Sequence, residues 1–332
     1  MMIQPNGPPS LSRRRAWLRF AESYALLGAW LIVIVVFAIA LPGSFLTWTN
    51  FSVMFTTQSP GAILALALIV PLTAGDYDLS VGATVTLSAI LIGALNVWWQ
   101  IPIGWVLVIT MLAGGAVGLV NAFFVVVLRI PSLVVTLGTA SLITGLVQWL
   151  SGSSTIGGIS PWLVRNIAEH QIFGVSYAFY YAVITAALLW YVFGRTPLGQ
   201  RLLFVGRGRE VARLVGINVG RARAGCLVAS SMLAALAGII YVGLLGAADP
   251  VSGLNFLLPA FAAAYLGATS IVPGRFNPWG AFIAVYFLSS GITGLSMLGI
   301  PLWVTNIFNG GALILAVTLS QFARGREQMD LG

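Results

Sequence analysis

The chain has 332 residues, of which 59% are hydrophobic and only 7% are charged, and its mean hydropathy is +0.98. Soluble domains carry about 25% charged residues, so this composition excludes a soluble protein and indicates one that lies almost wholly in lipid. The formal net charge is +8, all 16 basic residues are arginine, and the single cysteine, Cys226, excludes an internal disulfide. Because the arginines lie beside apolar runs, they indicate membrane orientation rather than nucleic-acid binding.

Ten apolar runs follow one another along the chain, with lengths suited to helices that cross the ~30 Å hydrocarbon core of a bilayer. They lie at residues 23–41, 51–72, 80–98, 103–128, 132–150, 176–193, 225–247, 256–270, 279–298 and 302–320. The sequence therefore predicts an all-α polytopic membrane protein of about ten transmembrane helices. A single transmembrane domain would occupy residues 23–320, between cytoplasmic tails at 1–22 and 321–332.

The first run follows a cluster of arginines and so resembles a secretory signal peptide, with Ala38-Ile39-Ala40 as the cleavage site in that interpretation. Its length favours a retained membrane anchor. Residues 1–12 are rich in proline and glycine, and we expect them to be disordered. Within the long outward loop at 151–175, Pro161 and Trp162 predict the start of a short helix.

The charges predict the orientation. With the N-terminus inside, 15 of the 16 arginines fall in inward segments, and only Arg165 lies outside. Positive residues are enriched in cytoplasmic loops, and removing one span or reversing the orientation would scatter the arginines over both sides. We therefore expect both termini on the cytoplasmic side. The loop at 194–224 would then be the main cytoplasmic segment.

Two apolar runs contain helix breakers at matching places in the two halves of the chain. The first has Gln58-Ser59-Pro60-Gly61 and leads to a polar turn at 75–82, and the second has Leu258-Pro259 and leads to a turn at 273–280. Interrupted backbone at membrane depth is tolerated where protein or water satisfies it, and paired interruptions are typical of a translocation path built from repeats. We therefore predict two pseudo-repeated halves with interrupted helices, although ordinary proline kinks remain the alternative for each site alone.

The residues needed for catalysis are missing from the sequence. It has one cysteine, one histidine, His170, and eight carboxylates, with no phosphate-binding loop and no metal-ligand spacing. We therefore expect a transport protein rather than an enzyme, without a metal or other cofactor in this chain. The spans hold almost no charge, which argues against coupling to an ion gradient.

Neutral polar residues within the spans suit a neutral polyhydroxylated solute, although each one is also typical of packing between membrane helices. Candidate path residues are Asn121, Thr136, Thr139, Asn306 and Asn309. Asp78 has two interpretations: an N-cap that accepts from the N–H of Ser80 or Val81, or a contact with the solute or a coupling ion.

The middle of the cytoplasmic loop, at 207–217, predicts a short helix. Apolar Val211, Leu214 and Val215 could enter a groove on a partner, and Gly216 is placed to end the helix. An arginine-rich helix lying on anionic lipid is the alternative. The residues expected to contact a partner here are Arg207, Arg209, Glu210, Arg213, Leu214 and Gly216.

Several motifs resemble those of the permease subunits of bacterial ATP-binding cassette importers for monosaccharides. Residues 75–82, GDYDLSVG, are similar to the family's G-x-x-Asp-Leu-Ser-Val-Gly, with Gly75, Asp78, Ser80 and Gly82 at the matching positions. Further similarity lies in GGAVGLVN at 114–121, PSLVVTLGT at 131–139 and GRGREVARLVGINV at 206–219. The chain departs from the family pattern at Val211 and at Asn255-Phe256-Leu257, so it resembles a divergent branch.

This resemblance implies a location in the inner membrane of a bacterial cell and a set of partners. They are a second permease chain, identical or similar, a separate cytoplasmic ATPase that docks on the loop helix, and an extracytoplasmic solute-binding protein. The implied solute is a monosaccharide or related polyol. A branched-chain amino acid or a nucleoside carried by the same machine is one alternative, and an autonomous secondary carrier is another.

Overall fold

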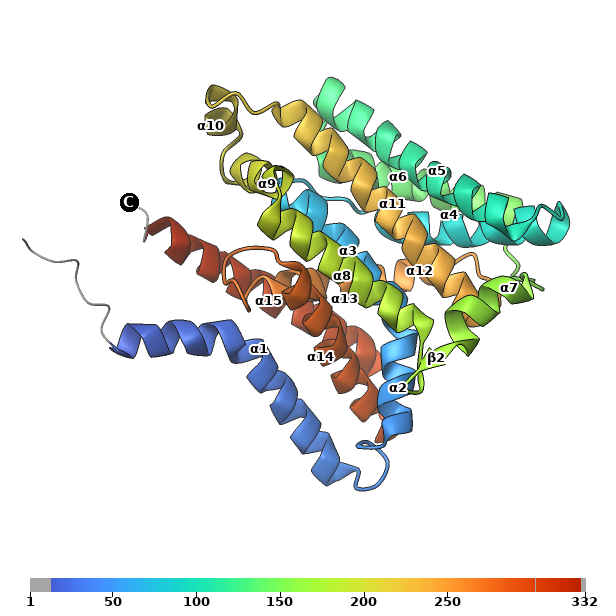
Figure 1. Cartoon of the computed structure of the whole chain (residues 1–332), viewed down its shortest axis with the longest axis horizontal. Helices are drawn as coiled ribbons and strands as arrows, with labels where there is room; N and C mark the ends of the chain where they lie inside the picture. Colours follow the sequence, from blue (N-terminus) through green and yellow to red (C-terminus); the bar gives the residue numbers. More distant parts are fainter. Residues whose placement is uncertain (1–12, 302, 330–332) are drawn as a thin grey trace, which may run out of the picture.

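The structure, a computed structural model, describes residues 13–301 and 303–329, so the predicted disorder of residues 1–12 lies outside the described residues. A helix occupies each of the ten predicted apolar runs (Figure 1). The longer ones are α1 (Arg13–Ala40), α2 (Trp48–Thr57), α3 (Ser59–Thr73), α4 (Val81–Gly93), α5 (Ile103–Ala122), α6 (Ser132–Ser151), α8 (Tyr177–Arg195), α9 (Pro197–Arg207), α11 (Val219–Leu245), α13 (Leu257–Gly267), α14 (Pro278–Met297) and α15 (Trp303–Met329). The prediction of an all-α polytopic membrane protein is confirmed.

Shorter elements complete the chain. Three π-helical turns, η1 (Ala94–Trp98), η2 (Phe123–Val127) and η3 (Arg165–Glu169), extend α4, α5 and the four-residue helix α7 (Pro161–Val164). The helix expected at Pro161 is therefore present. Two other short helices are α10 (Arg209–Leu214) and α12 (Ser252–Asn255), and four two-residue strands, β1 (Ile156–Gly157) with β4 (Ala247–Ala248) and β2 (Gln171–Ile172) with β3 (Val175–Ser176), form two antiparallel pairs.

Within the described residues, fewer than ten helices are long and apolar enough to count as membrane spans. Seven helices are long and apolar enough to cross a membrane, and α2 with α3, bent by 46° at their break, makes an eighth. The two remaining runs form shorter apolar helices, Tyr24–Ala40 and Ser252–Gly267. The second lies between β4, which ends at Ala248, and the irregular segment that follows Gly267, and these bounds limit its length.

Helix structure extends beyond both ends of the predicted transmembrane domain. Helix α1 already begins at Arg13, within the expected N-terminal tail, and α15 continues to Met329, beyond the predicted end of the last run at residue 320. Neither segment contains a proline or glycine cluster that would stop a helix at the apolar boundary.

The centre of the bundle is α3, whose 15 residues are all buried. A helix that is apolar all round is stable only when other helices cover every face, and α4, α8, α11, α13 and α14 do so here. Helix α11 lies along α5 on one side of the molecule, and α14 and α15 lie with α13 on the other (Figure 1).

Glycines set the closest helix contacts. A Cβ on Gly118 of α5 would lie 2.5 Å from the Val228 Cα of α11, and one on Gly114 would lie 2.6 Å from the Ala235 Cβ. Glycines spaced by four residues on α5 therefore allow its backbone to touch α11. A second close approach joins α4 to α12, where a Cβ on Gly82 would lie 3.1 Å from the Gly253 carbonyl oxygen, and one on Gly253 would meet the Gly82 carbonyl oxygen in turn.

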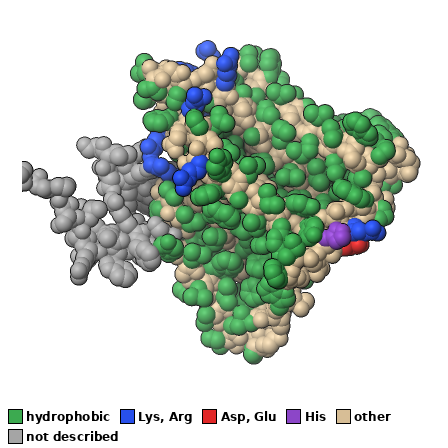
Figure 2. Space-filling model, in the orientation of Figure 1, with side chains coloured by type: hydrophobic (Ala, Val, Ile, Leu, Met, Phe, Trp, Pro, Cys, Tyr) green, Lys and Arg blue, Asp and Glu red, His purple; other side chains and the backbone are tan. Residues whose placement is uncertain are grey.

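Charge is concentrated at one end of the molecule. Basic side chains gather around the end that carries α9 and α10, whereas a histidine and an acidic side chain lie with a basic one near the opposite end (Figures 1 and 2). An apolar surface extends between the two ends (Figure 2). This distribution fits the predicted orientation, in which the end with α10 faces the cytoplasm.

Candidate coupling site and solute path

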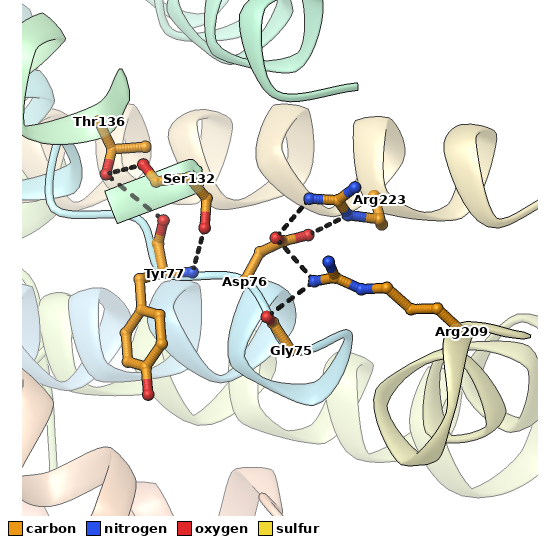
Figure 3. Close-up of polar contacts among 7 residues, drawn as sticks. All are labelled: Gly75, Asp76, Tyr77, Ser132, Thr136, Arg209 and Arg223. Carbon is orange, nitrogen blue, oxygen red and sulfur yellow. Dashed lines mark hydrogen bonds and ion pairs between the residues drawn. The ribbon is translucent and has the colours of Figure 1, made fainter. Parts of the chain in front are cut away.

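The polar turn between α3 and α4 holds a buried carboxylate. Asp76 is 1% exposed, and guanidinium groups from two distant helices converge on it (Figure 3). Arg223 of α11 donates from Nε to Asp76 Oδ2 and from Nη2 to Oδ1, both at 2.7 Å. Arg209 of α10 donates from Nη2 to Asp76 Oδ1 at 3.1 Å and to the Gly75 carbonyl at 3.0 Å. We call Asp76, Arg209 and Arg223 the ion-pair node.

The geometry of the node makes it a strong connection. The two Arg223 bonds are bidentate, and charge-assisted hydrogen bonds are about twice as strong as neutral ones. Because the Asp76 side chain is only 2% exposed, its charge is screened little by solvent. The node therefore ties the short helix α10 to the membrane helix α11 through the turn that begins α4.

The node is the functional feature that sequence reasoning missed. Arg209 was expected to ring the apolar tip of the loop helix, but its side chain turns inward to Asp76. Arg223 was assigned only a role in orientation. The available signal was that Asp76 is an acid on the strongly basic face, and a buried carboxylate requires a cation.

Helix α6 supports the same turn from its other side. The Ser132 Oγ accepts from the Tyr77 N–H at 3.1 Å, and the Thr136 Oγ1 accepts from the Leu79 N–H at 3.0 Å (Figure 3 draws the Ser132 contact). Thr136 in turn donates to the Ser132 carbonyl at 2.8 Å. Thr136, predicted as a path residue, thus fixes the backbone of the turn and lines neither of the two cavities described below.

Asp78 begins a second hydrogen-bonded chain. Its Oδ1 accepts from the Ser80 N–H at 3.1 Å and from the Ser80 Oγ at 2.5 Å. The predicted bond to the Ser80 N–H is therefore confirmed, but the N-cap position itself belongs to Ser80, because α4 begins at Val81. Burial raises the pKa of Asp78, and the Ser80 hydrogen bonds oppose that rise.

The chain from Asp78 continues across two more helices. Asn121 of α5 donates to the Ser80 Oγ at 2.9 Å, and Thr139 of α6 donates to the Asn121 Oδ1 at 2.7 Å. Two predicted path residues thus meet the predicted motif and link α4, α5 and α6. Their groups bond to each other, as expected of polar contacts between membrane helices.

The loop helix is shorter than predicted. Helix α10 covers Arg209–Leu214, because Gly208 separates it from α9, whereas the sequence suggested one helix over 207–217. Gly216 has φ +81°, and its N–H donates to the Arg213 carbonyl at 3.0 Å, so the predicted glycine at the helix end is confirmed.

The outer face of α10 is apolar and uncovered within the described residues. Leu214 is 87% exposed, and Val211 and Val215 are also exposed, whereas Ala212 is buried on the inner side. Glu210 and Arg213 form an exposed ion pair at 2.7 Å beside this apolar tip. An exposed apolar tip with charged neighbours is typical of a surface that another protein covers.

A cavity of about 590 Å³ lies beneath α10. Its wall includes Asp76 and the turn, the segment that joins α5 to α6, and the start of α11. Four arginines face two carboxylates in this wall: Arg129, Arg209, Arg213 and Arg223 against Asp76 and Glu210. The space therefore has a positive lining at the end expected to face the cytoplasm.

A second cavity, of about 210 Å³, lies between the two helix breaks. It is lined by Gln58, Gly61, Asn255, Phe256, Pro259, Ala260, Val285, Leu288, Ser289, Ile292 and Thr305. We call it the break cavity. The predicted path residues Asn306 and Asn309 lie next to Thr305 in α15 but do not line it; Asn306 is exposed, and the buried Asn309 Oδ1 has no partner among the described residues.

Comparison with known proteins agrees with these features. Residues 50–317 match a family of permease components described as a branched-chain amino acid transport system. The chain is 30% identical to the autoinducer 2 import system permease protein LsrD of Photorhabdus laumondii, over 90% of this chain and 91% of the relative. It is 31% identical to the corresponding LsrC protein of an Enterobacter species, over 88% and 84% of the two chains.

A third relative is the D-allose transport system permease protein AlsC of Escherichia coli K12, which is 26% identical over 91% of this chain and 92% of the relative. The family match covers both helix breaks, the ion-pair node and α10. This chain, with its buried polar turn and its bundle of apolar helices, belongs to that family of transport permease components.

Proposed function

We propose that this chain is the membrane-spanning subunit of an ATP-driven importer for a monosaccharide or related polyol. Its partners would be a second permease chain, a cytoplasmic ATPase and an extracytoplasmic binding protein that delivers the solute. The observation that carries the proposal is the exposed tip of α10, joined at its base to the ion-pair node. Relatives named for autoinducer 2 and D-allose support the solute class.

The structure suggests how such a subunit would be driven. An ATPase seated on Val211, Leu214 and Val215 would move α10 when it binds ATP. Arg209 would pass this displacement to Asp76, which is bonded to both α10 and α11 and lies in the turn that opens α4. The ATPase partner would supply the energy, and no cofactor is expected in this chain.

The docking role is tested by placing a charge on the tip. Burying a leucine side chain contributes about 1.5–3 kcal/mol, so a buried carboxylate in its place should weaken docking by at least about tenfold. We expect Leu214→Asp to abolish most ATP-dependent uptake in vesicles that contain all three partners. The matched control is Phe173→Ser, because Phe173 is equally exposed, at 86%, in the loop beside β2 at the opposite end.

Two results would contradict the proposal. One is normal ATP-driven uptake by the Leu214→Asp variant at an unchanged protein level in the membrane. The other is solute uptake by the purified chain alone, driven by an ion gradient, which would favour an autonomous carrier. If the transported solute is a branched-chain amino acid or a nucleoside, the ATP-driven importer stands and only the proposed solute class is wrong.

A further inference from the structure

The break cavity joins the two interruptions that the sequence places in different halves of the chain. Gln58 separates α2 from α3, and Asn255 with Phe256 separates α12 from α13. Helix α14 supplies Ser289, and α15 supplies Thr305. In the predicted orientation Thr305 lies near the outer end of its helix, so the cavity is in the outer half of the bundle.

Four polar side chains line this cavity without using their hydrogen-bonding capacity on the protein. Within the described residues, the side chains of Gln58, Asn255, Ser289 and Thr305 form no hydrogen bond. Elsewhere in the bundle, buried hydroxyls such as those of Thr84 and Ser88 bond to carbonyls of their own helices. Of the four, Ser289 is buried, Gln58 and Thr305 are partly buried and Asn255 is exposed, so all four groups are available to a ligand or to water in the cavity.

The backbone adds another acceptor. Pro259 has no N–H to donate to the Asn255 carbonyl four residues earlier, so the break leaves that oxygen without its helical donor. An interrupted helix at membrane depth is tolerated where protein or a water-filled cavity satisfies the freed backbone groups. The break thus has a chemical consequence, since it exposes hydrogen-bonding groups that a continuous helix would occupy.

The chemistry of the wall restricts the ligand. None of the residues that line the break cavity is ionisable. A zwitterion would have to leave water without a countercharge, which costs several kcal/mol per ion, whereas a neutral polyol can exchange water for amide and hydroxyl partners. Phe256, half-buried and in edge contact with Tyr241 at 5.7 Å between ring centroids, supplies an apolar face for the C–H side of a sugar ring.

The size of the cavity fits the same class. Its volume of about 210 Å³ corresponds to roughly seven water molecules at about 30 Å³ each. It lies below the roughly 300–1,000 Å³ of pockets for drug-sized ligands, so the solute must be small.

We propose that the break cavity is a holding site for one neutral, polyhydroxylated solute of monosaccharide size. Gln58, Asn255, Ser289 and Thr305 bond its hydroxyl groups, and Phe256 packs against its ring. The proposal rests on the transport function proposed above and adds to it the place and the chemistry of the solute within this chain.

Cysteine protection tests the site in the full complex in vesicles. The chain offers a suitable background, because Cys226 is buried, and wild type serves as the blank. Ser289→Cys is labelled with a small polar methanethiosulfonate, alone and with aldopentoses and aldohexoses that include D-allose. The matched control is Ser296→Cys, because Ser296 is an exposed serine of the same helix, α14, and does not line the cavity.

We expect at least one monosaccharide to slow labelling of Ser289→Cys, by about tenfold at ten times its half-protecting concentration, and to leave labelling of Ser296→Cys unaffected. L-leucine and uridine should give no protection. The inference is overturned if residue 289 is not labelled, if no sugar protects it, or if leucine or uridine protects it instead.

ATP-driven uptake of the protecting sugar, measured in the same vesicles, separates the two proposals. If a sugar protects residue 289 but its uptake needs an ion gradient rather than ATP, the proposed function is wrong and the proposed site stands. ATP-driven uptake of a sugar that does not protect residue 289 would remove the site and retain the function.

Discussion

Asp76 is a buried carboxylate whose positively charged partners come from distant parts of the sequence. Its two cations are 133 and 147 residues away in the sequence, and both belong to the basic segment that includes α10 and the start of α11. Removing one member of a buried ion pair costs about 3–5 kcal/mol, because the remaining charges stay desolvated. Here the cost is reduced, since the Arg209 side chain is 40% exposed.

Asp76→Asn should therefore impair coupling more than membrane insertion. We expect solute uptake to fall by at least about tenfold, while ATP hydrolysis by the complex continues but loses its stimulation by loaded binding protein. The ratio of ATP consumed to solute moved checks this. Glu169→Gln is the control, because its ion pair with Arg165 is exposed and long, at 3.9 Å, and such pairs contribute about 0–1 kcal/mol. An unchanged ratio in Asp76→Asn would contradict the coupling role.

At this scale the sequence predicted local contacts and missed distant ones. The bond from Ser80 to Asp78 spans two residues, and the motif around it made that bond predictable. The partners of Asp76 depend on how α10 and α11 pack, and no spacing in the sequence encodes that packing. The same limit applies to the break cavity, where Gln58 could be identified by its neighbouring proline but Ser289 and Thr305 had no local signal.

Among the helices, the contact between α5 and α11 depends on the absence of side chains. Gly118 touches the backbone of α11 at Val228, where even one methyl group would force the two helices apart. Overpacking a well-packed interior costs about 1–3 kcal/mol or more, and helix backbones cannot rotate away as side chains can. The glycines of α5 therefore determine how α11, which carries Arg223, sits in the bundle.

Gly118→Leu should destabilise the folded protein in the membrane. We expect a lower yield of protein that survives extraction in mild detergent, and a lower melting temperature of what remains. Gly138→Leu is the matched control, because nothing lies within 4 Å of a Cβ at that position in α6. Equal melting temperatures for the two variants would show that the α5–α11 contact does not limit stability.

Helix existence was predictable here, but helix ends were less so. All ten apolar runs are helical in the described residues, since apolar composition alone forces the backbone to bond internally in lipid. The division of the cytoplasmic segment into α9 and α10 was missed, because Gly208 was interpreted as part of one helix. The continuation of α15 to Met329 was missed because hydropathy marks the edge of the membrane and carries no information on where a helix stops.

For the whole molecule, the main question is whether the two shorter apolar helices cross the membrane. The positive charges fit ten crossings, whereas length and composition support seven or eight. The ion pair between Arg209 and Asp76 already requires α10 and the α3–α4 turn to be on one side. Helix α13 is the informative case, because it alone separates the β4 end from the turn that contains Val272.

Single cysteines decide this with a membrane-impermeant maleimide. We expect Val272→Cys to be labelled only in inside-out vesicles and Val251→Cys only in right-side-out vesicles, because both residues are exposed and α13 lies between them. The parent chain, with its buried Cys226, is the blank. Labelling of both positions from the same side would mean that the orientation inferred from the arginines is wrong for this half.

The contact between Gly82 and Gly253 has a mechanical consequence. Two side chains in contact can adjust to a small movement of their helices by changing rotamer. Two backbones in contact cannot adjust in this way, so a movement of one helix displaces the other. Gly82 lies in the first turn of α4, directly after the turn that contains Asp76, and Gly253 lies in α12, two residues before Asn255 at the break cavity. Helices α4 and α12 should therefore move as one rigid unit, with the ion-pair node at one end and the wall of the break cavity at the other.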